Sequence, residues 1–227
     1  MIKSFNRLSR SLAFKMDYFT SDLHFGHRNI IRYCNRPFNT VSEMNLGIIE
    51  NWNNVVTDKD RVFVVGDVAL CGTEEAKEYI TQLNGHKICI KGNHDGHEKH
   101  MLKMGFDEFH YSFDYEMPDG RVALLNHYPV PRELFKNYDI LIHGHIHHGP
   151  RVRGERLNVS CEIWDFAPVS VDRLCSLETF KDRIDDTVNI NIDESGRINL
   201  SVSVEVVDFG GVSEHIFKEL KKFWGHK

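Results

Sequence analysis

Short apolar runs that end abruptly in a polar residue recur along this chain. Five of them, which begin near residues 17, 61, 87, 121 and 140, lead into Asp, His or Asn. A run of roughly four to eight apolar or β-branched residues is typical of a buried strand. A nearly continuous run is expected where a strand is covered on both faces. The pattern therefore predicts five strands that carry polar side chains at their carboxyl ends.

Apolar residues at helical spacing separate several of these strands. Thr40-Val-Ser-Glu43 has the form of a capping box. The apolar residues that follow it recur at helical spacing, so a helix is predicted from about Val41 to Val55. Further helices are predicted over residues 74–83, from about His97 to Met104, and after Ser170 as a cap. Together with the buried strands, these helices indicate an α/β fold.

Turn signals predict two hairpins. Pro118-Asp-Gly120 separates the strand-like segments 109–116 and 121–125. Asp193-Glu-Ser-Gly196 separates residues 187–192 from residues 197–207, which have an alternating pattern. The first hairpin leads directly into one of the polar strand ends, whereas the second lies beyond all of them.

The length of 227 residues predicts one domain with additions at its ends. Residues 1–15 contain four basic and no acidic residues, and are interpreted as a basic arm or as residues that precede a true start at Met16. Residues 16–183 contain the polar strand ends and form the predicted main domain. Residues 184–227 are predicted to be an appended hairpin followed by a helix over residues 212–224, an extension that could serve homo-oligomer formation.

Composition excludes some classes of function. The net charge of −5 and the pI near 6.3 argue against general nucleic-acid binding, which needs a basic surplus, although a local basic site stays open. No apolar stretch approaches the roughly 18 residues of a membrane span. The five cysteines are odd in number and form no C-x-x-C motif, which indicates reduced thiols in a cytoplasmic protein.

Histidines are concentrated in one part of the chain. Ten of the 14 lie between His86 and His148, and the densest group follows the apolar run at residue 140. Gly144 is expected to let the chain turn sharply there, because glycine adopts backbone angles that other residues resist. Imidazole is the commonest side-chain metal ligand. We therefore interpret His145 and His147 as a metal-binding pair, and His148 as part of a polar turn.

Seven side chains at the five strand ends are candidate metal ligands. In α/β sheets, ligands bind outside the carboxyl ends of the strands, so these side chains can converge. Two carboxylates, four imidazoles and one amide oxygen suit Mn²⁺, Fe or Zn²⁺ better than Mg²⁺ or Ca²⁺. Seven ligands exceed what one ion takes from a protein, which favours two ions that share a bridging carboxylate. The seven are Asp22, His24, Asp67, Asn93, His127, His145 and His147.

Five short motifs in a fixed order resemble the calcineurin-like metallophosphoesterases. They are Asp22-x-His24, Gly66-Asp67, Gly92-Asn-His-Asp95, His127 and Gly144-His-x-His147. The resemblance covers about residues 17–175, and the start Asp22-Leu-His-Phe-Gly-His27 looks like a small bacterial and phage branch of that family. It implies a four-layer α/β/β/α sandwich with a dinuclear metal site.

The resemblance also implies a role for each residue of the motifs. Asp22, His24 and His147 would hold one ion, Asn93, His127 and His145 the other, and Asp67 would bridge them. The two cations would generate a bridging hydroxide that attacks phosphorus. His94 would protonate or hydrogen-bond the leaving oxygen. For Asp95, a capping acid at a helix start and a part in orienting His94 are equally favoured.

Four residues around this site are candidate substrate-binding groups: Asn93, His27, Arg28 and Arg36. Arginine holds phosphate in bidentate fashion, and Arg28 lies next to the predicted metal loop. Elsewhere a surface arginine is more often a solvated charge.

The sequence departs from the protein-phosphatase branch of the family after its Gly-Asp motif. That branch continues with a second Asp and an Arg, whereas this chain has Val68-Ala-Leu-Cys71. We therefore predict a phosphodiesterase that hydrolyses a small phosphodiester or nucleotide, with two divalent ions, Mn²⁺ before Fe, Zn²⁺ or Ni²⁺. The alternatives are a phosphomonoesterase with the same site, a DNA nuclease, and a non-catalytic interaction scaffold on the same fold.

Overall fold

The computed structural model describes residues 14–179, 188–192 and 198–202, and the chain divides into two units, residues 1–180 and 181–227. In the first unit, the first sheet has the strand order β10-β1-β2-β3-β4. Strands β1 to β4 pair in parallel, and β10 pairs with β1 in antiparallel fashion. Their bounds are β1 Asp17–Thr20, β2 Arg61–Val64, β3 His86–Ile90, β4 Glu108–His110 and β10 Val169–Ser170.

The second sheet has the strand order β5-β6-β7-β9-β8. Its central strands β6, β7 and β9 are parallel, and the two edge strands pair in antiparallel fashion. Because parallel strands present their carboxyl ends at one edge, each sheet gathers its polar strand ends together. The bounds are β5 Phe113–Glu116, β6 Val122–Leu125, β7 Ile140–His143, β8 Val152–Arg153 and β9 Arg156–Asn158.

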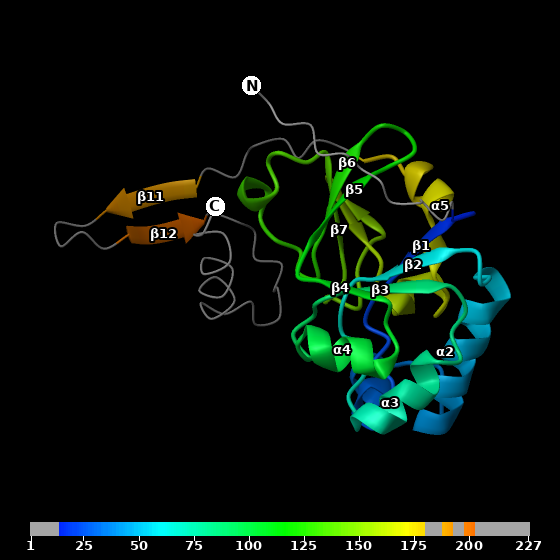
Figure 1. Ribbon diagram of the computed structural model, residues 1–227. Coiled ribbons are helices and arrows are strands. Elements are labelled where there is room, and N and C mark those ends of the chain that lie inside the picture. The colour runs from blue at the N-terminus through cyan, green and yellow to red at the C-terminus, as the bar shows by residue number, and fades with distance from the viewer. Residues whose placement is uncertain (1–13, 180–187, 193–197, 203–227) are drawn as a thin grey trace. The chain divides into compact units, whose positions relative to one another are not determined.

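Helices cover one face of the first sheet, and the second sheet covers the other (Figure 1). The helix α2, Val41–Val55, has the predicted bounds and buries Met44, Ile48, Ile49 and Trp52. The Thr40 side chain accepts a hydrogen bond from the Glu43 N–H, as a capping box requires. The other helices are α1 Arg28–Tyr33, α3 Thr73–Ile80, α4 Glu98–Met104 and α5 Val171–Cys175, with the 3₁₀ turns η1 Arg132–Leu134 and η2 Cys161–Trp164. Ser170 caps α5, as predicted.

Two buried apolar clusters hold these layers together. One lies between the helices and the first sheet, and includes Trp52 and Ile80. The other lies between the sheets, where the rings of Phe19 and Phe63 stack with centroids 5.2 Å apart and Tyr115 meets the Phe19 ring edge-on. Burying such aromatic side chains is the main driving force for joining the two sheets.

The outer face of the second sheet is covered by a loop in the described part of the chain. Leu124 and Leu141 alternate with the inward-facing residues of β6 and β7 and are buried. Arg156, next to the inward-facing Leu157, lies against the Phe135 ring. The loop that carries η1 therefore contributes to the cover of this face. In the first unit, the described residues establish a mixed α/β fold of two mixed sheets and five helices.

One predicted strand is divided in the structure. Residues 109–116 were expected to form a single arm of a hairpin, but β4 belongs to the first sheet and β5 to the second. The chain passes between the sheets at Tyr111-Ser112, so only β5 pairs with β6. Periodicity along one chain does not reveal such a crossing, because both halves are strands.

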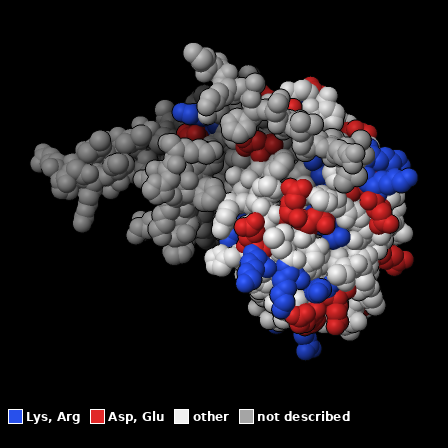
Figure 2. Space-filling model, viewed as in Figure 1, with Lys and Arg blue, Asp and Glu red and all other residues white. Residues whose placement is uncertain are grey.

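In the second unit, β11 Val188–Ile192 pairs with β12 Ile198–Val202 in antiparallel fashion. The predicted continuation to residue 207, the helix over residues 212–224 and residues 1–13 of the basic arm lie outside the described residues. Within the described residues no helix is long and apolar enough to cross a membrane. All five cysteines are free thiols. Figure 2 shows acidic and basic side chains interspersed over one face.

Candidate metal centre

The structure brings all seven predicted ligands to the carboxyl ends of β1, β2, β3, β6 and β7. Six of them form two groups whose ligand atoms lie within 4.8 Å of one another inside each group, and both groups could hold a metal ion. The seventh, Asn93, places its Oδ1 3.0 Å from Nε2 of His127 in the second group. The first group is Asp22, His24 and His147, and the second is Asp67, His127 and His145.

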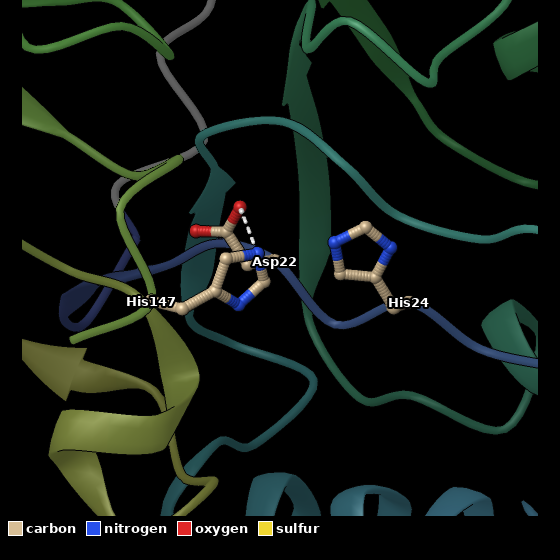
Figure 3. A group of neighbouring side chains, drawn as sticks. All are labelled: Asp22, His24 and His147. Atoms are coloured by element: carbon tan, nitrogen blue, oxygen red, sulfur yellow. Dashed lines mark ion pairs between the residues drawn. The ribbon is translucent and has the colours of Figure 1, made fainter. Parts of the chain in front are cut away.

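Asp22 holds the first group in place from the loop after β1. Its Oδ2 accepts hydrogen bonds from Ser21 Oγ at 2.5 Å, Ser160 Oγ at 2.8 Å and the His145 N–H at 2.9 Å. Its Oδ1 lies 3.8 Å from Nε2 of His147, the ion pair drawn in Figure 3. One carboxylate oxygen is therefore saturated by the protein, and the other is left to face the histidines.

The ring nitrogens of His24, which the described part of the chain leaves unpaired, indicate that a cation fits in the first group. Its side chain is buried, and neither ring nitrogen has a hydrogen-bond partner among the described residues. Burial lowers the pKa of His24 to about 3, so the ring is neutral and carries a free lone pair. Buried polar atoms are nearly always paired. A divalent cation between His24, Asp22 and His147 would supply the missing partner, and the donor set suits one.

In the second group, a main-chain carbonyl orients the ring of His127. His127 Nδ1 lies 2.8 Å from the Val65 carbonyl oxygen, which directs Nε2 toward Asn93 Oδ1 and toward Oδ2 of Asp67 at 3.4 Å. The ring centroids of His127 and His145 are 5.1 Å apart. A metal-binding histidine commonly donates the N–H of its second ring nitrogen to a carbonyl oxygen in this way.

Asp67 lies between the two groups. Its Oδ2 is 3.8 Å from Nε2 of His24 in the first group and 3.4 Å from Nε2 of His127 in the second. Its Oδ1 accepts a hydrogen bond from the His94 N–H at 2.9 Å. One carboxylate oxygen thus faces both groups at once, which is the position that a shared ligand would occupy.

Five of the seven side chains sit on left-handed backbone. The φ angles are 58° at Asp22, 52° at His24, 56° at Asp67, 74° at His145 and 46° at His147. Such angles cost on the order of 1–3 kcal/mol each for a residue with a Cβ, and they cluster at functional sites. The surrounding hydrogen bonds must therefore hold these turns, and the strain aims the side chains into one space.

Gly144 serves a different purpose from the one predicted. Its φ is not positive; the left-handed angles fall on the neighbouring histidines instead. A Cβ at Gly144 would lie 2.6 Å from Oδ2 of Asp22 and would also collide with Ser21 Oγ. The absence of a side chain is needed for close approach between the loops that follow β7 and β1.

The histidines differ in charge. Burial lowers the pKa of His145 to about 4. Burial also opposes charge on His127, but the carboxylates of Asp67 and Asp22 outweigh it and raise the pKa to about 9. His147 is likewise raised, to about 11, by hydrogen bonds with Cys34 and Glu162 and by nearby carboxylates. Without a cation, the protonated rings of His127 and His147 lie beside the carboxylates of Asp67, Asp22 and Glu162.

Asp95 neither caps α4 nor bonds to the ring of His94 among the described contacts. The N-cap of α4 is His97, so the interpretation of Asp95 as a capping acid is wrong. Its carboxylate is buried and accepts the backbone N–H groups of Asp67, Val68 and Gly92 at 2.8–2.9 Å. Asp95 therefore fixes the loop after β2 against the loop after β3. The His94 side chain is exposed, with its ring centroid 5.6 Å from that of His24.

The predicted substrate-binding residues are placed differently from one another. Arg28 is exposed at the start of α1, and His27 lies half-buried with its ring centroid 5.4 Å from that of His24. Arg36 was expected at the rim, and this is wrong. Its guanidinium is buried in an ion pair with Glu162, Nη2 to Oε1 at 2.6 Å, where no substrate can reach it.

Sequence reasoning missed four residues around the first group. Glu162 lies 2.7 Å from Nδ1 of His147, and Cys34, His147 and Glu162 form a third group of neighbouring ligand atoms. Ser21 and Ser160 hold Asp22. Ser160 and Glu162 follow the parallel strand β9, so the pattern of polar residues after an apolar strand could have identified them. Cys34 gives no such signal.

Three known proteins are similar to this chain over most of its length. The uncharacterized protein MJ1445 of Methanocaldococcus jannaschii is 36% identical over 176 residues, covering 73% of this chain and 93% of that protein. The gene 66 protein of Mycobacterium phage L5 is 28% identical over 212 residues, covering 79% and 97%. The crystal structure of AQ665 from Aquifex aeolicus, a protein of unknown function, is similar at 30% identity and a TM-score of 0.59, covering 72% and 99%. No protein-family model matches the chain.

Proposed function

The chain belongs to the same family as the uncharacterized protein MJ1445 of Methanocaldococcus jannaschii, and we propose that it is a metal-dependent phosphoesterase. The observation that carries the proposal is the position of Asp67, whose Oδ2 faces a histidine of each candidate metal group. Two adjacent cation sites with a shared carboxylate are typical of enzymes that displace an oxygen at phosphorus. The order of the sequence motifs supports the same reaction.

In this proposal, each group of ligands binds one cation. Asp22, His24 and His147 hold one divalent cation, and Asn93, His127 and His145 hold the second, with Asp67 between them. When bound, the cations neutralise phosphate oxygens and make water a stronger nucleophile. Mn²⁺ is the first candidate, because the set mixes carboxylate, imidazole and amide donors.

The protein's own groups act around the phosphorus. His94 is exposed at the site while its backbone N–H is fixed on Asp67, so its ring can reach a leaving oxygen and donate a proton to it. Asp95 holds that loop rigid through backbone hydrogen bonds. Arg28, exposed at the start of α1, and His27 are the side chains that would contact the rest of the substrate, together with the Asn93 amide.

The substrate is a small phosphodiester or nucleotide. The loop after Asp67 contributes no cationic side chain, since Val68 is buried and Leu70 is exposed and apolar. A phosphomonoester carries close to two negative charges near neutral pH, because its second pKa is about 6. A diester carries one, so two cations neutralise it without an additional arginine clamp.

The proposal also covers the fold, the place in the cell and the C-terminal residues. The fold is a four-layer α/β/β/α sandwich of the metallophosphoesterase type, in which the loop with η1 reduces the outer layer. The protein acts in the cytoplasm, and residues 184–227 serve association into a homo-oligomer rather than catalysis.

The test is a substrate panel with the manganese-loaded full-length protein. It compares bis-p-nitrophenyl phosphate, nucleotides and phosphopeptides, with chelator-treated protein as the control. Hydrolysis that disappears with the chelator and returns with Mn²⁺ supports the proposal. A protein that binds the ions and hydrolyses none of these esters is a non-catalytic scaffold, and the proposal fails.

A further inference from the structure

Glu162 is a buried carboxylate directly behind a predicted metal ligand. It lies in η2, after β9, and its side chain is 7% exposed. Its Oε1 is 2.7 Å from Nδ1 of His147. The same oxygen accepts hydrogen bonds from Arg36, at 3.0 Å from Nε and 2.6 Å from Nη2. A carboxylate paired with an always-charged guanidinium is ionised and can only accept, so Nδ1 of His147 carries the hydrogen.

Arg36 connects this carboxylate to the loop after β1. Its Nη2 donates to the Asp22 carbonyl oxygen at 2.6 Å, and its Nη1 donates to the Leu23 carbonyl oxygen at 2.9 Å. The guanidinium is completely buried. One arginine therefore fixes both Glu162 and the main chain that carries Asp22 and His24.

The neighbouring thiol suggests another role for Glu162, as a ligand in the group Cys34, His147 and Glu162. Two contacts oppose it. Oε1, the oxygen that faces His147, is already occupied by Arg36, and a cation at this carboxylate would be repelled by the guanidinium at close range. The nitrogen of His147 that faces Glu162 is used in the hydrogen bond between them. Glu162 is better placed to act through His147.

We propose that Glu162, held by Arg36, is a positioning residue that directs Nε2 of His147 toward the cation shared with Asp22 and His24. The inference rests on the proposed metal centre and adds a residue to it. Carboxylates behind metal-binding histidines fix the ring orientation and raise ligand basicity, and losing one typically costs 10–100-fold in metal affinity.

The two candidate sites are unequal in this respect. Behind His147 is an ionised carboxylate, whereas behind His127 is the neutral carbonyl of Val65, 2.8 Å from Nδ1. A charged partner strengthens a ligand more than a neutral one does. Glu162 therefore stabilises the cation of the first group selectively.

The experiment is a calorimetric titration of Mn²⁺ into the metal-free full-length protein and its Glu162→Gln variant. The matched control is Glu155→Gln, because Glu155 is a similarly buried carboxylate paired with Arg132, Nε to Oε2 at 2.7 Å, and no histidine of the described residues pairs with it. Glu162→Gln should weaken one of two binding steps about 10–100-fold and leave the other unchanged. Glu155→Gln should leave both unchanged. Equal weakening of both steps in Glu162→Gln, or of neither, overturns the proposal.

A second comparison tests whether Glu162 acts through His147. In a His147→Ala background, Glu162→Gln should cause no further loss of affinity; an additional loss of the same size contradicts the proposal. The wild-type protein provides a readout that does not depend on a variant folding. In the Zn²⁺-loaded form, nitrogen NMR should show His147 protonated at Nδ1 and metal-bound at Nε2, and the reverse assignment overturns it. A wild type that binds no divalent cation would instead refute the proposed function itself.

Discussion

Oδ2 of Asp67 lies 3.4 Å from Nε2 of His127. The same oxygen is 3.8 Å from Nε2 of His24, which belongs to the other candidate metal group. The other carboxylate oxygen is held by the His94 N–H, so the side chain is fixed with one oxygen directed at both histidines. No other described carboxylate makes ion pairs with histidines of both groups.

Asp67→Asn should therefore weaken both cation sites rather than one. The amide keeps an oxygen but loses the negative charge that both ions would share. Elemental analysis after equilibration with Mn²⁺ should find fewer than two ions per chain, with both calorimetric steps weakened. Asp60→Asn is the control, since Asp60 is a buried carboxylate that binds Thr57 away from the site. Loss of a single step in Asp67→Asn, with the other intact, would refute the bridging role.

His94→Ala should bind Mn²⁺ like the wild type and yet hydrolyse esters of poor leaving groups about 10²–10⁴-fold more slowly. The reason is that the exposed imidazole lies beside the ligands and is proposed to donate a proton to the leaving oxygen. The defect should shrink for p-nitrophenyl esters, whose leaving group needs little proton donation. His97→Ala, at the exposed N-cap of α4, is the matched control and should retain full activity. A defect of equal size across leaving groups, or loss of metal, would assign His94 another role.

The strand ends were the part of this site that sequence reasoning could predict. A polar residue directly after a buried parallel strand has its place fixed by the fold, which is why Asp22, Asp67 and His127 come together as expected. The partners of these residues follow no such rule. Arg36 and Glu162 are 126 positions apart, and Arg36 looks like a surface arginine in sequence. Only packing shows that it is buried.

The bounds of the helices were easier to predict from the sequence than the path of the backbone between the secondary-structure elements. Helical periodicity gave α2 its bounds, because one apolar face decides where such a helix packs. Gly144 was expected to permit a sharp backbone turn. Glycine is needed there instead because a Cβ would collide with Asp22. The crossing between β4 and β5 and the loop over the outer face of the second sheet depend on contacts between distant segments, which a local pattern does not contain.

Binding of divalent cations should release protons. The pKa values of His127 and His147 are raised from 6.5 to about 9 and about 11, so both rings carry an additional proton at neutral pH. A cation must displace a proton from each ring, and binding should therefore tighten as the pH rises through about 9 and, less steeply, on toward about 11.

Calorimetry in two buffers of different ionisation enthalpy measures the protons released. His127→Ala should lower their number by about one, whereas His148→Ala, an exposed neighbour of the site, should not change it. A binding enthalpy that is the same in both buffers would show that these rings are neutral in the metal-free protein.

The substrate preference follows from the uncharged loop after Asp67. We expect kcat/KM for bis-p-nitrophenyl phosphate to exceed the values for p-nitrophenyl phosphate and for a phosphopeptide, measured on one manganese-loaded preparation. The exposed Leu70 cannot pair with the second charge of a monoester. Faster turnover of the phosphopeptide than of the diester would overturn this preference and favour a phosphatase.

We propose that two cations are bound at this site, one by each candidate group, with Asp67 shared between them. Anomalous diffraction at the manganese edge from crystals grown with Mn²⁺ tests it most directly. We expect two peaks, both beside Asp67. One should lie within bonding distance of Asp22, His24 and His147, and the other within bonding distance of Asn93, His127 and His145. A single peak, or a peak among Cys34, His147 and Glu162 instead, would contradict it.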